Sequence, residues 1–213
     1  MQADLNGKVA LVTGGARDIG RATALALAKN GAAVVVNYNA SADRARALCD
    51  EIRAAGGLLA RKALGEMDVA FWDEVMNLNL RSVAFVTQAL LPHMADGGAI
   101  VNLSSLAARD GGGPGSVAYA TAKGGVLTLT RGLSKELASR KIRVNCVSPG
   151  MIDTTFHDTF TKPEARKATA ARTTVGREGT ADDVANAIVF LASDASSYIN
   201  GESIEINGGL YYV

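Results

Sequence analysis

The chain has 213 residues, of which 48% are hydrophobic and 20% are charged, a composition typical of one folded domain with a sizeable core. Its 22 Lys and Arg residues nearly balance its 21 Asp and Glu residues. Such a chain lacks the basic surface that binds nucleic acids or anionic membranes, so we expect neither as a partner. No apolar run approaches the roughly 18 residues of a spanning helix, and no signal peptide precedes the first predicted strand, so we expect a cytoplasmic protein.

Short apolar runs alternate with helical patterns along most of the chain. Residues 8–14 form an apolar run that ends at glycine, as buried parallel strands do, and residues 20–32 carry alanine and leucine at helical spacing. A strand at 32–38 and a helix at 41–57 follow. This order predicts an α/β fold, with a doubly wound, Rossmann-like parallel sheet in a single domain over residues 1–213. The later strands are expected at 97–105, 141–150 and 201–208, and the later helices at 71–93, 117–139 and 180–194.

The alternation fails between Tyr38 and Ile100. About sixty residues there contain helix after helix and no convincing strand, although a βαβ unit takes roughly 30 residues or more. The stretch EIRAAGGLLARK leads from one helix toward the next across two glycines. One βαβ unit is therefore expected to be missing, between about Ala54 and Leu59.

The turn after the first strand, VTGGARDIG, is suited to a phosphate group. Gly14 and Gly20 allow the backbone to come close to a ligand, and the helix that follows offers unpaired N–H groups and the positive end of its dipole. Its place between a strand and a helix makes the pattern more specific than a lone pair of glycines. The alternative is a tight turn with no ligand.

The stretch YATAK places Tyr119 and Lys123 four residues apart on a helix, so both side chains lie on one face. A lysine ammonium near a phenol stabilises the phenolate and lowers the pKa of the phenol. A tyrosine tuned in this way can exchange a proton with a carbonyl or alcohol oxygen near neutral pH.

These motifs occur in an order that resembles the short-chain dehydrogenase/reductase family. TGGARDIG is similar to the family's T-G-x-x-x-G-x-G motif, in which Asp18 replaces the usual middle glycine, and GGAIVNLSS, YATAK and VNCVSPG follow in the expected order. The resemblance implies an oxidoreductase that interconverts a carbonyl and a secondary alcohol, with Tyr119 as proton donor and acceptor. It also implies that Lys123 tunes Tyr119 and holds the nicotinamide ribose.

Two further catalytic roles follow from the resemblance. Ser105 would donate a hydrogen bond to the substrate oxygen, with Ser104 as the alternative. Asn79 would hold a water molecule of a proton relay, and Asn77 fits the family register less well.

Charge favours NADP(H) over NAD(H), although NAD(H) stays possible. NAD sites usually place an acid after the second strand, whereas this strand ends VVVNYNAS. Arg17 lies in the glycine turn, where it could meet a 2′-phosphate, and Asn37 and Ser41 could add hydrogen bonds to the same group. The remaining cofactor contacts that the resemblance implies come from Asp18, Ile19, Pro149, Gly150, Ile152 and Thr154.

Residues 155–177 are polar and correspond to the family's substrate lid. Five basic residues and a histidine against two acids suggest an anionic small-molecule substrate, although a solvated helix face would look the same. Several stretches resemble the sugar-acid branch of the family, which includes keto-uronate reductases, and the 3-oxoacyl-carrier-protein reductase branch is the other close template. The resemblance also implies a homo-oligomer, either a tetramer or a dimer.

The missing unit has its own consequences under this resemblance. The family places a strand beside the first strand and ends it in an Asn-Asn-Ala-Gly turn that contacts the cofactor. If the unit is deleted, the first strand must pair with the strand at 97–105, or the centre of the sheet is open. We then expect weak or absent cofactor binding, and the alternative function is a catalytically impaired or silent fold.

Overall fold

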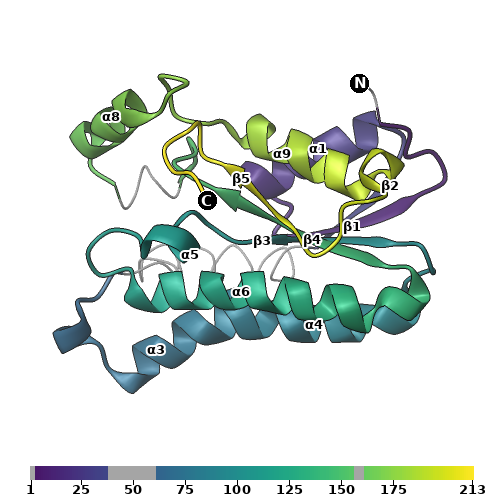
Figure 1. Cartoon of the computed structure of the whole chain (residues 1–213), viewed down its shortest axis with the longest axis horizontal. Coiled ribbons are helices and arrows are strands. Elements are labelled where there is room, and N and C mark those ends of the chain that lie inside the picture. The colour runs from purple at the N-terminus through teal and green to yellow at the C-terminus, as the bar shows by residue number, and fades with distance from the viewer. Residues whose placement is uncertain (1–2, 38–60, 156–160) are drawn as a thin grey trace, which may run out of the picture.

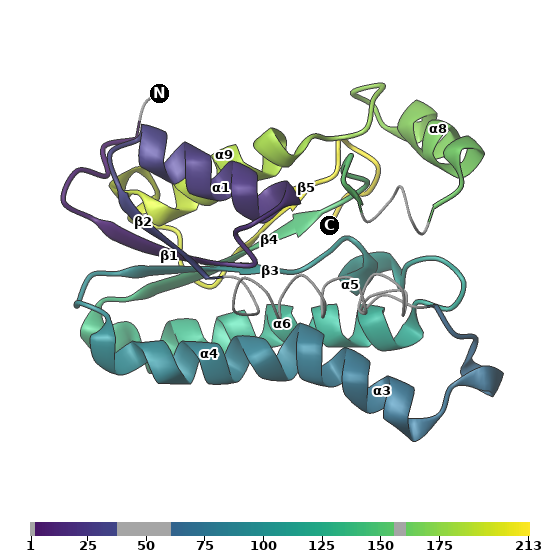
Figure 2. The same cartoon turned by 180° about the vertical axis from the view of Figure 1, so that it is seen from behind.

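The structure is a computed structural model that describes residues 3–37, 61–155 and 161–213. Its strands lie between two layers of helices (Figures 1 and 2), which confirms the predicted α/β architecture with parallel strands. Every strand that the sequence predicts in these ranges is present. The strands are β1 (Val9–Thr13), β2 (Ala33–Asn37), β3 (Ala99–Leu103), β4 (Arg143–Pro149) and β5 (Ser203–Ile206).

Helices cover both faces of the strands. On one side lie α1 (Asp18–Lys29) and α9 (Ala181–Ala192), and on the other lie α4 (Ser82–Leu90) and α6 (Val117–Glu136) (Figure 1). The remaining helices are α3 (Val69–Met76), α5 (Ala107–Asp110) and α8 (Pro163–Arg172), with short 3₁₀ turns at Leu64–Glu66, Leu91–His93, Ala138–Arg140 and Asp194–Ser196.

The sheet is divided in the part of the chain that the structure describes. β1 pairs in parallel with β2, from Val9 opposite Ala33 to Thr13 opposite Asn37. A second, three-stranded sheet has the order β3-β4-β5, also parallel. No register joins β1 to β3 within the described ranges. Direct pairing of the first strand with the strand at 97–105, one of the two outcomes expected for a missing unit, is therefore not found among the described residues.

The division changes the environment of β1. The sequence predicts a buried strand, but Val9 is 75% exposed and Leu11 is 41% exposed, so that prediction is wrong for these side chains. β4, which has a neighbour on each edge, is buried almost throughout, and Val144 and Val147 are inaccessible to solvent. A parallel strand is buried by its neighbours as well as by helices, and β1 lacks a described neighbour on one edge.

Arg143, at the start of β4, ties the three-stranded sheet to the end of α9. One guanidinium nitrogen donates to Leu191 O and to the Ser196 hydroxyl, each at 2.9 Å, and the other donates to Ser193 O at 2.9 Å. An arginine can donate to several acceptors at once. Arg143 therefore adds to the hydrogen bonds that the Ser196 hydroxyl makes with the Leu191 and Ser193 carbonyls.

The long helix expected at 71–93 is a continuous helical run with an irregular centre. α3 passes into a π-helical turn at Asn77–Arg81, which passes into α4. π turns inside α-helices are frequently found at functional sites. Asn79, a candidate catalytic residue, lies in this turn.

Some expectations concern residues outside the described ranges. They are the helix at 41–57 with Ser41, the proposed junction at Ala54–Leu59, and part of the lid. The missing unit therefore stays a prediction. None of the described helices is long and apolar enough to cross a membrane, and no cluster of His, Cys, Asp or Glu in the same ranges could hold a metal ion.

Candidate active site

A cavity of about 1730 Å³ lies where the strands and the catalytic motifs meet. It exceeds the roughly 300–1,000 Å³ of an ordinary ligand site, because it continues from the motif residues along β1 and β3, between the two sheets. The structure brings every described candidate residue to its wall. These residues are Gly14, Arg17, Asp18, Ile19, Gly20, Asn37, Asn79, Ser105, Tyr119, Lys123, Pro149, Gly150, Ile152 and Thr154.

Tyr119 and Lys123 project from one face of α6 into this cavity, as their spacing predicts. The Ser105 hydroxyl is close enough to Tyr119 to lower the pKa of the phenol. The Lys123 ammonium donates to the Leu103 carbonyl at 3.0 Å and lies 5.7 Å from the centre of the Tyr119 ring. The end of β3 and the start of α6 thus hold a hydroxyl, a phenol and an amine together.

The two adjacent serines have different environments. Ser104 is 3% exposed, and its hydroxyl donates to the Lys123 carbonyl at 2.8 Å. Ser105 carries the contact with Tyr119 and accepts a hydrogen bond from Ala107 N at 3.2 Å. Ser105 therefore faces Tyr119, and Ser104 is held against the helix backbone.

Burial dominates the protonation of the catalytic pair. It raises the pKa of Tyr119, and the hydrogen bond with Ser105 opposes this rise less strongly. Burial also lowers the pKa of Lys123 to about 8, with a smaller opposing effect from the Cys146 thiol. The sequence predicts that Lys123 lowers the pKa of Tyr119, and the direction found here is the opposite. The reason is that burial disfavours the charged form of both groups.

Asn79 and Asn77 lie in different environments. Asn79 is 9% exposed, and its amide donates to Val75 O at 3.0 Å from within the π turn. Asn77 accepts a hydrogen bond from Arg81 at 2.9 Å on the exposed side of the helix. Only Asn79 lines the cavity among these two asparagines.

The glycine turn is closely packed. Gly14 has φ +65°, which favours glycine, and a Cβ on Gly20 would lie 2.2 Å from the Gly14 carbonyl oxygen. Asp18 has φ +49° at the position where the family has glycine, and this conformation costs an L-residue on the order of 1 kcal/mol. The side chain of Arg17 is 66% exposed and lies 4.0 Å from the Asp18 carboxylate.

The three arginines of the lid fall into two groups. Arg166 is paired with Asp153 and Glu178, and Arg177 is paired with Asp183 at 2.8 Å. Arg172, in the last turn of α8, lines the cavity instead.

Sequence reasoning missed two residues at this end of the cavity. Arg61 packs against the glycine loop after α5, where a Cβ on Gly115 would lie 2.9 Å from the Arg61 Cβ. Tyr211 lines the cavity from the C-terminal segment. Their sequence signals were weak, because one basic residue in LLARK and one tyrosine near the end of the chain match no motif.

Taken together, a glycine turn at the start of a helix, beside a Ser-Tyr-Lys cluster, defines a nicotinamide-dependent oxidoreductase. A family model described as short chain dehydrogenase matches residues 8–61, and one described as Enoyl-(Acyl carrier protein) reductase matches residues 52–211. The chain belongs to the short-chain dehydrogenase/reductase family. It is an NAD(P)-dependent oxidoreductase that acts on CH–OH groups.

Relatives support this membership along the whole chain. A 3-oxoacyl-[acyl-carrier-protein] reductase FabG of Staphylococcus aureus is 35% identical over 243 residues, with 96% of this chain and 98% of the relative covered. The FabG of Thermotoga maritima is 37% identical over 245 residues, with 97% and 98% covered.

Solved structures agree with the fold. A dehydrogenase/reductase from Sinorhizobium meliloti matches with a TM-score of 0.85 and 31% identity, covering 99% of this chain and 98% of that one. A short-chain dehydrogenase from Burkholderia cenocepacia, solved in complex with NADP, matches with a TM-score of 0.83 and 31% identity, covering 97% and 98%.

Proposed function

We propose that this chain reduces the ketone of a 3-oxoacyl thioester to a secondary alcohol with NADPH, and that Tyr119 donates the proton. The observation that carries the proposal is the Ser105–Tyr119–Lys123 cluster at one cavity wall. Relatives that are 35–37% identical over nearly the whole chain are named as 3-oxoacyl-[acyl-carrier-protein] reductases, which supports a thioester as the substrate.

The residues at the glycine turn fit a dinucleotide. The close approach of Gly20 to Gly14 leaves no room for a side chain, and no side chain caps the first turn of α1. Those N–H groups can therefore receive a diphosphate. When bound, NADPH would supply the hydride. Pro149, Gly150, Ile152 and Thr154 would hold its nicotinamide end.

The protonation of Tyr119 suits reduction. Because burial raises its pKa, the phenol keeps its proton at neutral pH and can donate it from Oη to the oxygen of the reduced carbonyl. Ser105 would orient that oxygen by a hydrogen bond. Lys123 would hold the ribose and tune the phenol, and Asn79 would hold a water molecule that returns a proton to the site.

Arg17 supports NADPH over NADH. Its side chain is largely exposed in the glycine turn. The sequence at the end of β2, VVVNYNAS, contains no acidic residue that would repel a 2′-phosphate. NADH stays the alternative cofactor.

An anionic substrate group would meet Arg172 at the lid end of the cavity. Arg166 and Arg177 already face carboxylates, whereas no carboxylate partner of Arg172 lies among the described residues. The phosphate of an acyl carrier's prosthetic group is one such anion. This observation equally favours the second candidate, a keto-acid sugar such as a keto-uronate.

A turnover screen with NADPH separates the two substrates. Acetoacetyl-CoA is expected to be reduced and keto-uronates are not, and Arg172→Met should lower kcat/KM for acetoacetyl-CoA by about tenfold. Lys167→Met, which removes an exposed cation from the same helix, serves as the control. Turnover of keto-uronates alone would reject the thioester.

The missing unit is part of the proposal. A match over 243 residues contains at least 30 positions without a counterpart in a chain of 213, and the two family models meet at residues 52–61. The divided sheet is consistent with a missing central strand. We therefore expect weaker cofactor binding than in full-length relatives, with a silent fold as the alternative. Calorimetric titration with millimolar NADPH and NADH distinguishes the two alternatives. If neither cofactor gave heat of binding, the proposal of an active enzyme would be rejected.

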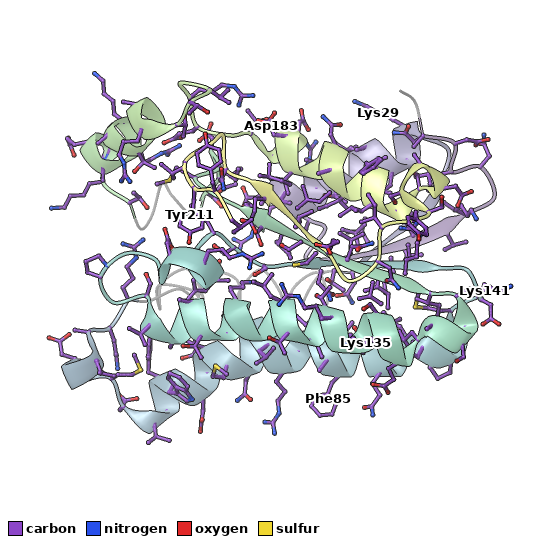
Figure 3. All side chains as sticks on the ribbon, in the orientation of Figure 1. Lys29, Phe85, Lys135, Lys141, Asp183 and Tyr211 are labelled. Carbon is purple, nitrogen blue, oxygen red and sulfur yellow. The ribbon has the colours of Figure 1, made fainter. Side chains whose placement is uncertain are left out.

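A homo-oligomer, either a dimer or a tetramer, is also part of the proposal. Phe85 is 57% exposed and points outward from α4 (Figure 3), and Val117, the first residue of α6, is 46% exposed. An apolar surface of this kind favours a partner. Light scattering after size-exclusion chromatography would measure the mass, and a monomer at micromolar concentration would contradict the expectation.

A further inference from the structure

Asp18 is held in a conformation that L-residues rarely adopt. Among the non-glycine residues that the structure describes, only Asp18 and Lys141 have positive φ, and Lys141 ends a short 3₁₀ helix at an exposed turn. Residues in such conformations persist only where their surroundings hold them, and they gather at functional sites. The contacts of Asp18 therefore point to a role in the site.

The Asp18 carboxylate does not cap its own helix. Its Oδ2 accepts a hydrogen bond from the Thr155 hydroxyl at 2.8 Å, and its Oδ1 accepts one from Thr155 N at 3.3 Å. The two residues are 137 positions apart in the sequence. This contact joins the glycine turn, where a diphosphate would lie, to the first residue of the proposed lid.

The segment that ends at Thr155, residues 152–155, is also held near its other end. Asp153 N donates to the Gly179 carbonyl at 2.8 Å, and Arg166 donates to the Asp153 carboxylate at 2.6 Å. Residues 152–155 form a strap, and its members Ile152 and Thr154 line the cavity. Asp18 thus fixes the end of the strap that the Gly179 and Arg166 contacts do not reach.

We propose that Asp18 is a positioning residue that links the two ends of the cofactor site. Its hydrogen bonds with Thr155 hold the strap against the nicotinamide end, while its charge weakens the binding of the diphosphate at the same turn. A carboxylate at the start of a helix competes with an anionic ligand for the dipole and the free N–H groups. The inference rests on the proposed function, because NADPH is the ligand. The orienting effect and the charge effect can be separated by substitution.

Asp18→Asn tests the charge. Asparagine tolerates positive φ and keeps an oxygen that can accept from Thr155, but it removes the negative charge. We expect the Kd for NADPH, measured by calorimetry, to fall by about threefold or more. Asp182→Asn removes an exposed carboxylate from the first turn of α9 and is the matched control, with no change expected.

Thr155→Val tests the orientation. The valine side chain has nearly the same shape but cannot donate to Asp18, so the strap keeps only the longer backbone hydrogen bond while the charge stays. We expect the Kd for NADPH to change by less than about twofold, while the fluorescence of bound NADPH shifts back toward that of free NADPH, because the nicotinamide is no longer held. A purely structural threonine would leave that emission unchanged. Thr128→Val, on the exposed side of α6, is the control.

The outcomes separate the inference from the function on which it rests. If wild type and Asp18→Asn bind NADPH equally, or if Thr155→Val leaves the emission of bound NADPH unchanged, the coupling by Asp18 is wrong and the proposed function stands. If neither wild type nor Asp18→Asn binds NADPH, both the inference about Asp18 and the proposed function are rejected. Tighter binding in Asp18→Asn together with altered emission in Thr155→Val supports the inference.

Discussion

Replacing Lys123 by methionine should change the stability of the protein with a sign that depends on pH. Burial lowers the pKa of Lys123 from 10.5 to about 8 in the folded state. Between these values the unfolded chain holds the proton more tightly, so the folded wild type gains stability as pH rises. Methionine fills a similar volume but carries no proton, so the variant lacks this gain.

The magnitude follows from the shift. A pKa lowered by about 2.5 units corresponds to a penalty of up to about 3 kcal/mol below pH 8, which we discount to roughly 2 because Lys123 lies in an open cavity. The variant loses the hydrogen bond to the Leu103 carbonyl, which costs about 1 kcal/mol. We therefore expect Lys123→Met to be more stable than wild type by about 1 kcal/mol at neutral pH. Near the unfolded pKa it should be less stable by a similar amount.

Urea unfolding followed by circular dichroism measures the difference in the free energy of unfolding between Lys123→Met and wild type. The measurements run from pH 7 to pH 10, a range that spans the folded pKa of Lys123 and approaches its unfolded pKa. Lys135→Met removes an exposed lysine from the same helix (Figure 3) and controls for the loss of charge. A difference between Lys123→Met and wild type that does not vary with pH would refute the reasoning.

Three further predictions concern the turn and the core. Gly20→Ala would place a Cβ 2.2 Å from the Gly14 carbonyl oxygen, so we expect a loss of about 2 kcal/mol in urea unfolding, and an unchanged stability would contradict the packing. Arg17→Ala should raise the Kd for NADPH about tenfold and leave that for NADH unchanged, measured by calorimetry; equal effects would argue against a 2′-phosphate contact. Arg143→Met removes three hydrogen bonds at the end of α9 and should cost about 3 kcal/mol, at about 1 kcal/mol for each bond, visible as a lower Tm, whereas an unchanged Tm would contradict that role.

The sequence allowed most of the local structure to be predicted. Apolar runs that end at turn residues mark the strands, and the spacing of Tyr119 and Lys123 puts both on one face of α6. It predicted Ser105 but could not exclude Ser104, because the choice depends on how the chain turns after β3. Only coordinates show that Ser104 bonds to the helix backbone.

Properties that depend on distant parts of the chain were not predictable. The exposure of Val9 depends on which strands flank β1, and β1 has no neighbour on one edge among the described residues. The partner of Asp18 lies far along the chain at Thr155. The direction of the Tyr119 pKa depends on how deeply the phenol is buried, which no spacing of two residues reveals.

The central claim is that this chain, with its divided sheet, uses Tyr119 to reduce a carbonyl with NADPH. The most direct test is a single-turnover experiment with excess enzyme, NADPH and acetoacetyl-CoA, in which NADPH absorbance is followed for wild type and for Tyr119→Phe. We predict that wild type consumes NADPH and that Tyr119→Phe consumes it at least about a hundredfold more slowly. Equal rates for the two proteins, or no consumption by wild type at saturating NADPH, would contradict the claim.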